Sequence, residues 1–173
     1  MVTKILVRVV LIICMALGFS NSLFAQMAKF QALYIFNFAK NTSWPMEDAN
    51  KDLVITIIGD NELTKELKTL AAAKKIMNRN VVVRSAASVA TVGKSDIVCL
   101  GEAKSEQINV VVNHQEGSKS LIVSSKQGHC ANGAGIAFTN NNGKLGFEIS
   151  DKNIQKNGLR IDRRLMDLGT EVY

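Results

Sequence analysis

The sequence has little of the chemistry from which catalytic and metal sites are usually built. Its 173 residues include two histidines, three cysteines, one tryptophan and one proline. His114 and His129 are not spaced with the cysteines as zinc ligands are, and no serine, histidine and acid are spaced as a catalytic triad. Glycines surround His129, but no Gly-Lys-Ser or Gly-Lys-Thr follows them, which excludes a phosphate-binding loop. We therefore expect no enzymatic activity, no metal and no cofactor.

Basic blocks interleaved with aromatic residues are also absent. The net charge of +6 is spread over scattered lysines and arginines, a distribution that argues against nucleic-acid binding. The chain has no internal repeat and no low-complexity linker. Its length and its many aliphatic residues are sufficient for one domain with its own hydrophobic core.

The amino end carries the pattern of a secretory signal peptide. Lys4 and Arg8 accompany an apolar run from Ile5 to Phe19, and small and polar residues follow up to Ala25. Cleavage after Ala25 would leave residues 26–173 as a single domain and lower the net charge to +4, because two basic residues and no acidic residue are removed. The alternative is a retained membrane anchor, but the uncharged run after Arg8 is shorter than the ~20 residues that span a bilayer.

The run from Leu53 to Ile58 is the strongest strand signal, because Thr56 is its only polar residue. A strand with one exposed face would alternate polar and apolar residues, so helices should cover both faces of this one. The run stops at Gly59. Asp60 or Asn61 is suited to cap a following helix that carries leucines at helical spacing.

Further strands and helices alternate along the chain. Strands are predicted at residues 80–84, 95–101, 120–124, 136–139 and 144–149, and helices at 27–40, 61–71, 102–112 and 151–156, with a closing amphipathic stretch at 159–168. Asparagines and Gly143 between the last two strands indicate a hairpin. The expected fold class is α/β, a three-layer, Rossmann-like sheet of mainly parallel strands with flanking helices and a C-terminal antiparallel hairpin.

Residues that directly follow the strands should meet at the carboxyl edge of the sheet, where open α/β folds bind ligands. The candidates for a ligand crevice there are Gly59, Asp60, Gly101, Glu102 and His129.

Cys99 and Cys130 are the two cysteines that remain after cleavage. In an oxidising, exported compartment two thiols are more often paired than free, so the sequence predicts a disulfide between them. Two buried free thiols are the alternative, because the sequence does not show whether the Cα atoms lie close enough to be bridged.

Three parts of the chain resemble the YfiR family: Phe30 to Lys40 with the following Ser43-Trp-Pro45, Ile57 to Asp60, and Gly133 to Gly169. The last part has a glycine-led strand, a phenylalanine-glutamate strand and a closing helix like those of the family. The best-known members are periplasmic proteins that hold an inner-membrane diguanylate cyclase inactive by binding its periplasmic region, which lowers cyclic di-GMP. The resemblance thus implies a periplasmic regulator whose partner is the extracytoplasmic region of a membrane signalling protein.

Other functions stay open at this point. The main alternative is a periplasmic small-ligand sensor or binding module that uses the crevice at the strand ends, and an enzyme that depends on His129 is a third interpretation. The sequence also leaves open whether the chain forms a homodimer.

Surface contacts with a partner are expected at two places. Trp44 is the first candidate, with a core position as the alternative, since the aromatic residues from Phe30 to Trp44 are spaced as helix core residues usually are. Arg160, Arg163 and Arg164 of the expected closing helix are the second, with an ordinary solvated helix face as the alternative.

Export predicts that protein isolated from its native envelope begins at Gln26. Intact-mass measurement should therefore show a chain without residues 1–25, because the signal peptidase removes them together with the apolar run. A mass that still includes these residues would contradict cleavage and favour the retained anchor.

Overall fold

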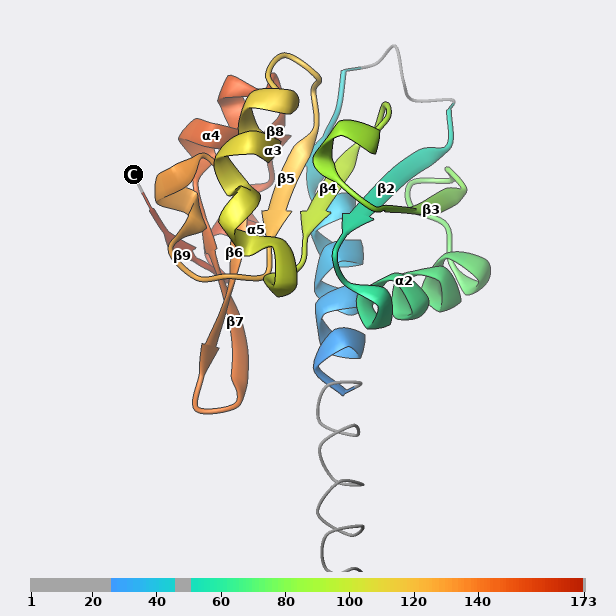
Figure 1. Ribbon diagram of the computed structural model, residues 1–173, viewed down its shortest axis with the longest axis horizontal. Helices are drawn as coiled ribbons and strands as arrows, with labels where there is room; N and C mark the ends of the chain where they lie inside the picture. Colours follow the sequence, from blue (N-terminus) through green and yellow to red (C-terminus); the bar gives the residue numbers. More distant parts are fainter. Residues whose placement is uncertain (1–25, 46–50, 173) are drawn as a thin grey trace, which may run out of the picture.

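The computed structural model describes residues 26–45 and 51–172 (Figure 1). The expected signal peptide and its cleavage position lie outside the described residues. Within the described ranges, no helix has both the length and the hydropathy that crossing a membrane requires.

A seven-stranded sheet forms the centre of the molecule, in the spatial order β3-β2-β4-β5-β6-β7-β9. Its strands are β2 (Leu53–Ile58), β3 (Val81–Ala86), β4 (Ile97–Leu100), β5 (Leu121–Ser124), β6 (Ile136–Asn141), β7 (Lys144–Ile149) and β9 (Thr170–Glu171). The neighbouring strands β3, β2, β4, β5 and β6 all run parallel, whereas β7 pairs antiparallel with β6. β9 then pairs parallel with β7. The predicted fold class is confirmed.

Helices lie on both faces of the sheet, as the apolar β2 requires. They are the first helix (residues 26–40), α2 (Asn61–Ala73), α3 (Ile108–His114), α4 (Asp151–Lys156) and α5 (Arg163–Met166), with short 3₁₀ segments η2 (Val89–Thr91), η3 (Glu102–Gln107) and η4 (His129–Asn132). In Figure 1, α3 lies in front of the sheet and the first helix behind it. The molecule thus has the expected three layers.

Alternate residues of β2 enter two separate core clusters. Ile55 and Ile57 pack in the first cluster, with side chains of the first helix, α2 and α4. Ile58 packs in the second, with side chains of α3 and η2. Thr56, the polar residue of the strand, is buried and shares a hydrogen bond of 2.7 Å with the hydroxyl of Ser95. Its burial therefore leaves no hydroxyl unsatisfied.

The turn after β2 forms as the sequence indicates. Gly59 has a φ of +75°, which favours glycine, and it ends the strand. Asp60 Oδ1 accepts a hydrogen bond of 2.9 Å from the backbone N–H of Leu63, so Asp60 is the N-cap of α2.

Aromatic side chains fasten the first helix to the hairpin. The ring of Phe38 lies 4.9 Å from the ring of Phe147 on β7 and 5.7 Å from that of Phe138 on β6. Tyr34 makes edge contacts with the same two rings. For these residues the core interpretation of the aromatic stretch is right, because their rings provide the contact between the helix and the sheet.

Two predicted helices differ from the structure. The segment after β4 begins as η3 and becomes α-helical at Ile108, where α3 starts. The closing stretch is not one helix, because Arg160–Ile161 forms a short strand, β8, that pairs antiparallel with β1 (Thr42–Ser43). Asp162 N–H extends this pairing by donating to the carbonyl of Asn41 at 2.8 Å. The pairing of Arg160 with Ser43, which is 117 residues away in the sequence, thus overrides the local helical pattern.

A buried ion pair joins the amino ends of the central strands. Arg79 and Asp96 lie 3.4 Å apart, with side chains 6% and 14% exposed. Arg79 also donates to the carbonyls of Lys51 and Asp52, and Asp96 accepts from the backbone N–H of Val54 at 2.7 Å. The pair therefore fixes the loops before β2, β3 and β4 relative to one another.

Replacing Arg79 should destabilise the protein, because it leaves the Asp96 carboxylate buried without its partner. We expect Arg79→Ala to lower the free energy of unfolding by about 3 kcal/mol, measured by denaturant unfolding. Lys156→Ala, which removes the exposed ion pair with Glu116, is the control and should cost less than about 1 kcal/mol. Equal losses in the two variants would contradict the role assigned to the buried pair.

Candidate functional site

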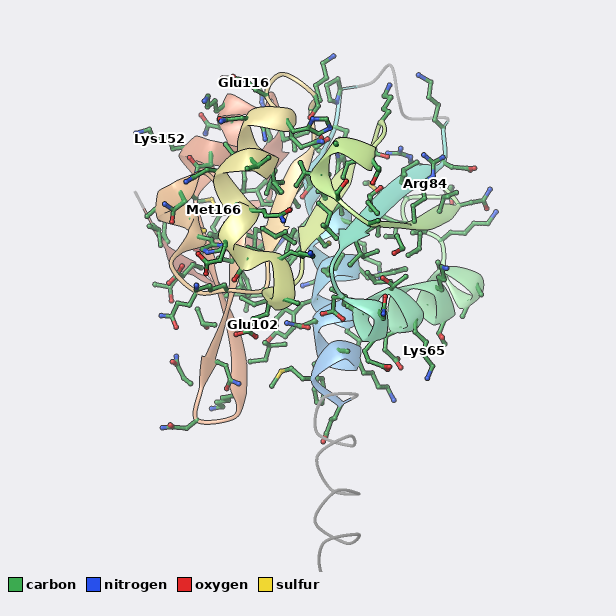
Figure 2. All side chains as sticks on the ribbon, in the orientation of Figure 1. Lys65, Arg84, Glu102, Glu116, Lys152 and Met166 are labelled. Atoms are coloured by element: carbon green, nitrogen blue, oxygen red, sulfur yellow. The ribbon has the colours of Figure 1, made fainter. Side chains whose placement is uncertain are left out.

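A groove with a volume of about 980 Å³ opens at the carboxyl ends of the parallel strands. The start of the first helix and the turn of the β6–β7 hairpin form its two sides, and the loops after β2, β4 and β5 form its floor. Figure 1 shows the first helix and the hairpin extending beyond this edge of the sheet. In Figure 2, Glu102 lies between them. The groove is therefore where open α/β folds bind ligands.

Three of the five predicted crevice residues line the groove, namely Gly59, Asp60 and Glu102. Gly101 lies beneath them. A Cβ at Gly101 would come within 2.8 Å of the Gly59 carbonyl oxygen and of Asp60 Cβ, so this glycine allows the loops after β2 and β4 to touch. These four residues thus lie together at the strand ends, as expected for a crevice. Their role in binding stays a prediction.

His129 does not line the groove. It is buried, and its Nδ1 shares a hydrogen bond of 2.7 Å with the hydroxyl of Ser124 at the end of β5. Burial and the nearby Lys126 lower the pKa of His129, although Glu106 and Glu148 act in the opposite direction. Ser124 is itself fully buried, so this serine-histidine contact orders the loop and offers no accessible nucleophile.

Sequence reasoning missed the side walls of the groove. Met27, Phe30 and Tyr34 of the first helix face Lys144 and Leu145 of the hairpin across it. Only the fold brings the helix and the hairpin together. A local signal exists in Phe30, which stands between the polar residues Lys29 and Gln31.

The charge of the groove is opposite to that of the chain. Its lining has three carboxylates, Asp60, Glu62 and Glu102, and one ammonium group, Lys144, whereas the whole chain has a net charge of +6. Asp60 caps α2. Glu62 and Glu102 are exposed and make no hydrogen bond or ion pair within the described residues. The groove thus combines apolar walls with acidic groups that have no basic partner.

The predicted disulfide is not formed, since Cys99 and Cys130 are free thiols in the structure. Cys99 belongs to the first core cluster. Cys130 lies in η4, packed beside the sheet, and its Sγ contacts the carbonyl of Gly135 at 3.8 Å. Burial raises the pKa of both thiols, that of Cys130 to about 12. The structure therefore agrees with the alternative to the disulfide, which is two buried free thiols.

Trp44 is half-buried and packs against the first core cluster, and its indole Nε1 is buried without a hydrogen-bond partner.

Arg160 and Arg163 line a second groove of about 690 Å³, near α4 and α5. Arg163 pairs with Asp167 at 3.5 Å. Arg164 pairs with Asp162 at 2.8 Å, and its hydrogen bonds lower the pKa of that carboxyl to about 2. The three arginines are exposed, but Arg160 belongs to β8 and not to a helix.

Metal-binding side chains do not gather in the part of the chain that the structure describes, where no group of three or more histidine, cysteine, aspartate or glutamate residues could hold an ion.

Comparison with protein families matches residues 28–170 to the model described as YfiR/HmsC-like. Comparison with curated proteins finds no match.

Free, buried thiols predict a specific reaction pattern for the chain that starts at residue 26. In denaturant without a reductant, both Cys99 and Cys130 should react with an alkylating reagent, because no disulfide protects them. In the native protein both should react far more slowly, because they are buried and the thiolate is the reactive form. Mass spectrometry counts the adducts, and a denatured chain that accepts none would show that the cysteines are paired.

Proposed function

The chain belongs to the YfiR/HmsC-like family, and from this premise we propose that it is an exported regulator. In this proposal it binds the extracytoplasmic region of a membrane signalling protein, such as a diguanylate cyclase, and holds that protein inactive. The observation that carries the proposal is the family match, which extends from the first helix to β9. The signal-peptide pattern at residues 1–25 supports a periplasmic location for the domain at 26–173.

The chemistry of the described residues fits a binding protein. Its one serine-histidine contact involves a fully buried serine, whereas its surface offers two grooves and exposed arginines. Binding to a partner requires accessible apolar and charged side chains, and both grooves have them. We therefore assign its action to contact with another protein.

The arginine surface is one candidate for this contact. Arg160 and Arg163 line the second groove together with Met166, an apolar residue of α5 that is partly exposed. Arginine beside an apolar side chain is a common combination in interfaces. Trp44 is a less suitable probe of contact, because it packs against the core and its removal would also lower stability.

A small-ligand sensor is the second candidate function. It is favoured by the volume of the groove at the strand ends, about 980 Å³, which is at the upper end of the ~300–1,000 Å³ typical of small-molecule sites. In this case Gly59, Asp60, Gly101 and Glu102 would hold the ligand.

Immobilised chain from residue 26 should capture a membrane protein with an extracytoplasmic region from detergent-solubilised native membranes, and adding the chain should lower cyclic di-GMP synthesis by that partner. We expect Arg160→Glu with Arg163→Glu to weaken capture about tenfold, a loss of about 1.4 kcal/mol, without changing the melting temperature. Lys65→Glu with Arg84→Glu is the matched control, since these exposed residues lie on the other side of the molecule from Met166, which borders the arginine groove (Figure 2).

Equal capture by the two double variants would remove the arginine surface from the contact but leave the regulator proposal intact. Failure of the unaltered chain to capture any membrane protein, together with a small molecule that raises its melting temperature, would favour the sensor.

A further inference from the structure

We propose that the groove at the strand ends receives a basic, apolar peptide segment of the membrane partner. The apolar side chains of that segment lie against the first helix, and its lysine or arginine side chains lie against Glu62 and Glu102. This inference rests on the proposed function, because it identifies the part of the partner that the regulator holds.

The apolar wall of the groove is exposed and continues beyond it. Phe30 lines the groove and is 46% exposed. Leu33 is 41% exposed and lies one helical turn further along, outside the groove lining. Residues three apart on a helix are neighbours on its surface. The exposed apolar surface is therefore longer than the groove, which suits an extended segment better than a compact small molecule.

The acidic groups give this segment its charge. Glu62 at the start of α2 and Glu102 at the start of η3 border the same groove from two different loops. Neither carboxylate has a basic partner within the described residues, and the lining as a whole has three carboxylates against one ammonium group. Complementary charge is what steers and orients two protein surfaces. A segment that combines apolar side chains with lysine or arginine matches both properties of the groove.

The hairpin provides the opposite side of the groove on a rigid support. Asn142 and Gly143 both have positive φ, 54° and 82°, as in the tight turns that join twisted strands. Asn140 Oδ1 accepts from the N–H of Gly143 at 2.9 Å, and Phe147 anchors the hairpin to the first helix. Because both sides are fixed by the core, the groove is formed before a segment binds, which reduces the entropy lost on binding.

Synthetic peptides test the chemistry of the groove directly. The probe is an amphipathic peptide of leucine and lysine with a fluorescent label, and the control peptide has glutamate in place of each lysine. We expect the basic peptide to bind the chain that starts at residue 26 and the acidic peptide not to bind. Binding should weaken as salt is added, since the Debye length falls from about 30 Å at 0.01 M to about 8 Å at 0.15 M.

Variants then locate the binding. Glu62→Lys with Glu102→Lys should weaken the affinity for the basic peptide about tenfold, since two exposed attractions become repulsions. Glu116→Lys with Glu171→Lys changes the net charge equally outside the groove lining, and it should leave the affinity within about twofold. Figure 2 shows Glu116 at the opposite end of the molecule from Glu102. Phe30→Ser with Leu33→Ser should also weaken binding, whereas the melting temperature reports whether each variant is folded.

Cross-linking connects the groove to the partner. A photoreactive residue at position 30 should cross-link a segment of the captured membrane protein that is apolar and contains lysine or arginine, whereas one at Val110, exposed on α3, should not. Capture that is unchanged in the groove variants, with no cross-link from position 30, would overturn this inference and leave the regulator proposal standing. A cross-link from position 30 to a second copy of the chain, equal binding of both peptides, or binding of a small molecule alone would also overturn it. Absence of any captured membrane protein would instead overturn the regulator proposal itself.

Discussion

The fold depends on a parallel sheet that is buried on both faces. β2 sends alternate side chains into two core clusters, so helices must cover each side of it. Parallel pairing of β2 with β3 and β4 also requires each connection to cross from one end of the sheet to the other. As a result, the loops that follow the strands meet at one edge. Gly59, Asp60, Gly101 and Glu102 lie there because of this constraint.

The groove forms because two elements extend beyond this edge of the sheet. The first helix and the β6–β7 hairpin both extend past the strand ends (Figure 1), and contacts between Tyr34 or Phe38 and Phe147 hold them side by side. Buried aromatic contacts therefore determine the shape of an exposed site. The apolar walls and the acidic floor come from different elements, and the same core holds both in place.

Polar groups inside the protein serve mainly to fix loops. Arg79 and Asp96 connect the amino ends of the strands, and the contact between His129 and Ser124 orders the loop after β5. Each of these groups is satisfied by a partner inside the protein, and none of the four lines the groove. Glu62 and Glu102, which have no ion-pair partner among the described residues, are instead exposed in the groove. The carboxylates of Glu62 and Glu102 are therefore available for binding.

The sequence by itself determined the elements whose signals are local. The apolar run Leu53–Ile58 specifies a strand buried on both faces, Asp60 specifies the start of α2, and the family match over residues 28–170 agrees with the resemblance of short segments. These features depend on residues a few positions apart, which the sequence displays directly.

Only the tertiary structure decided which distant residues meet. It pairs Arg160 with Ser43 in a strand where the local pattern indicates a helix, leaves Cys99 and Cys130 as free thiols, and places His129 beneath the surface. It also sets Phe30 opposite Lys144 across the groove. Such contacts depend on how the sheet and its helices pack, and packing free energy is shared among many residues, so no short stretch of sequence specifies it.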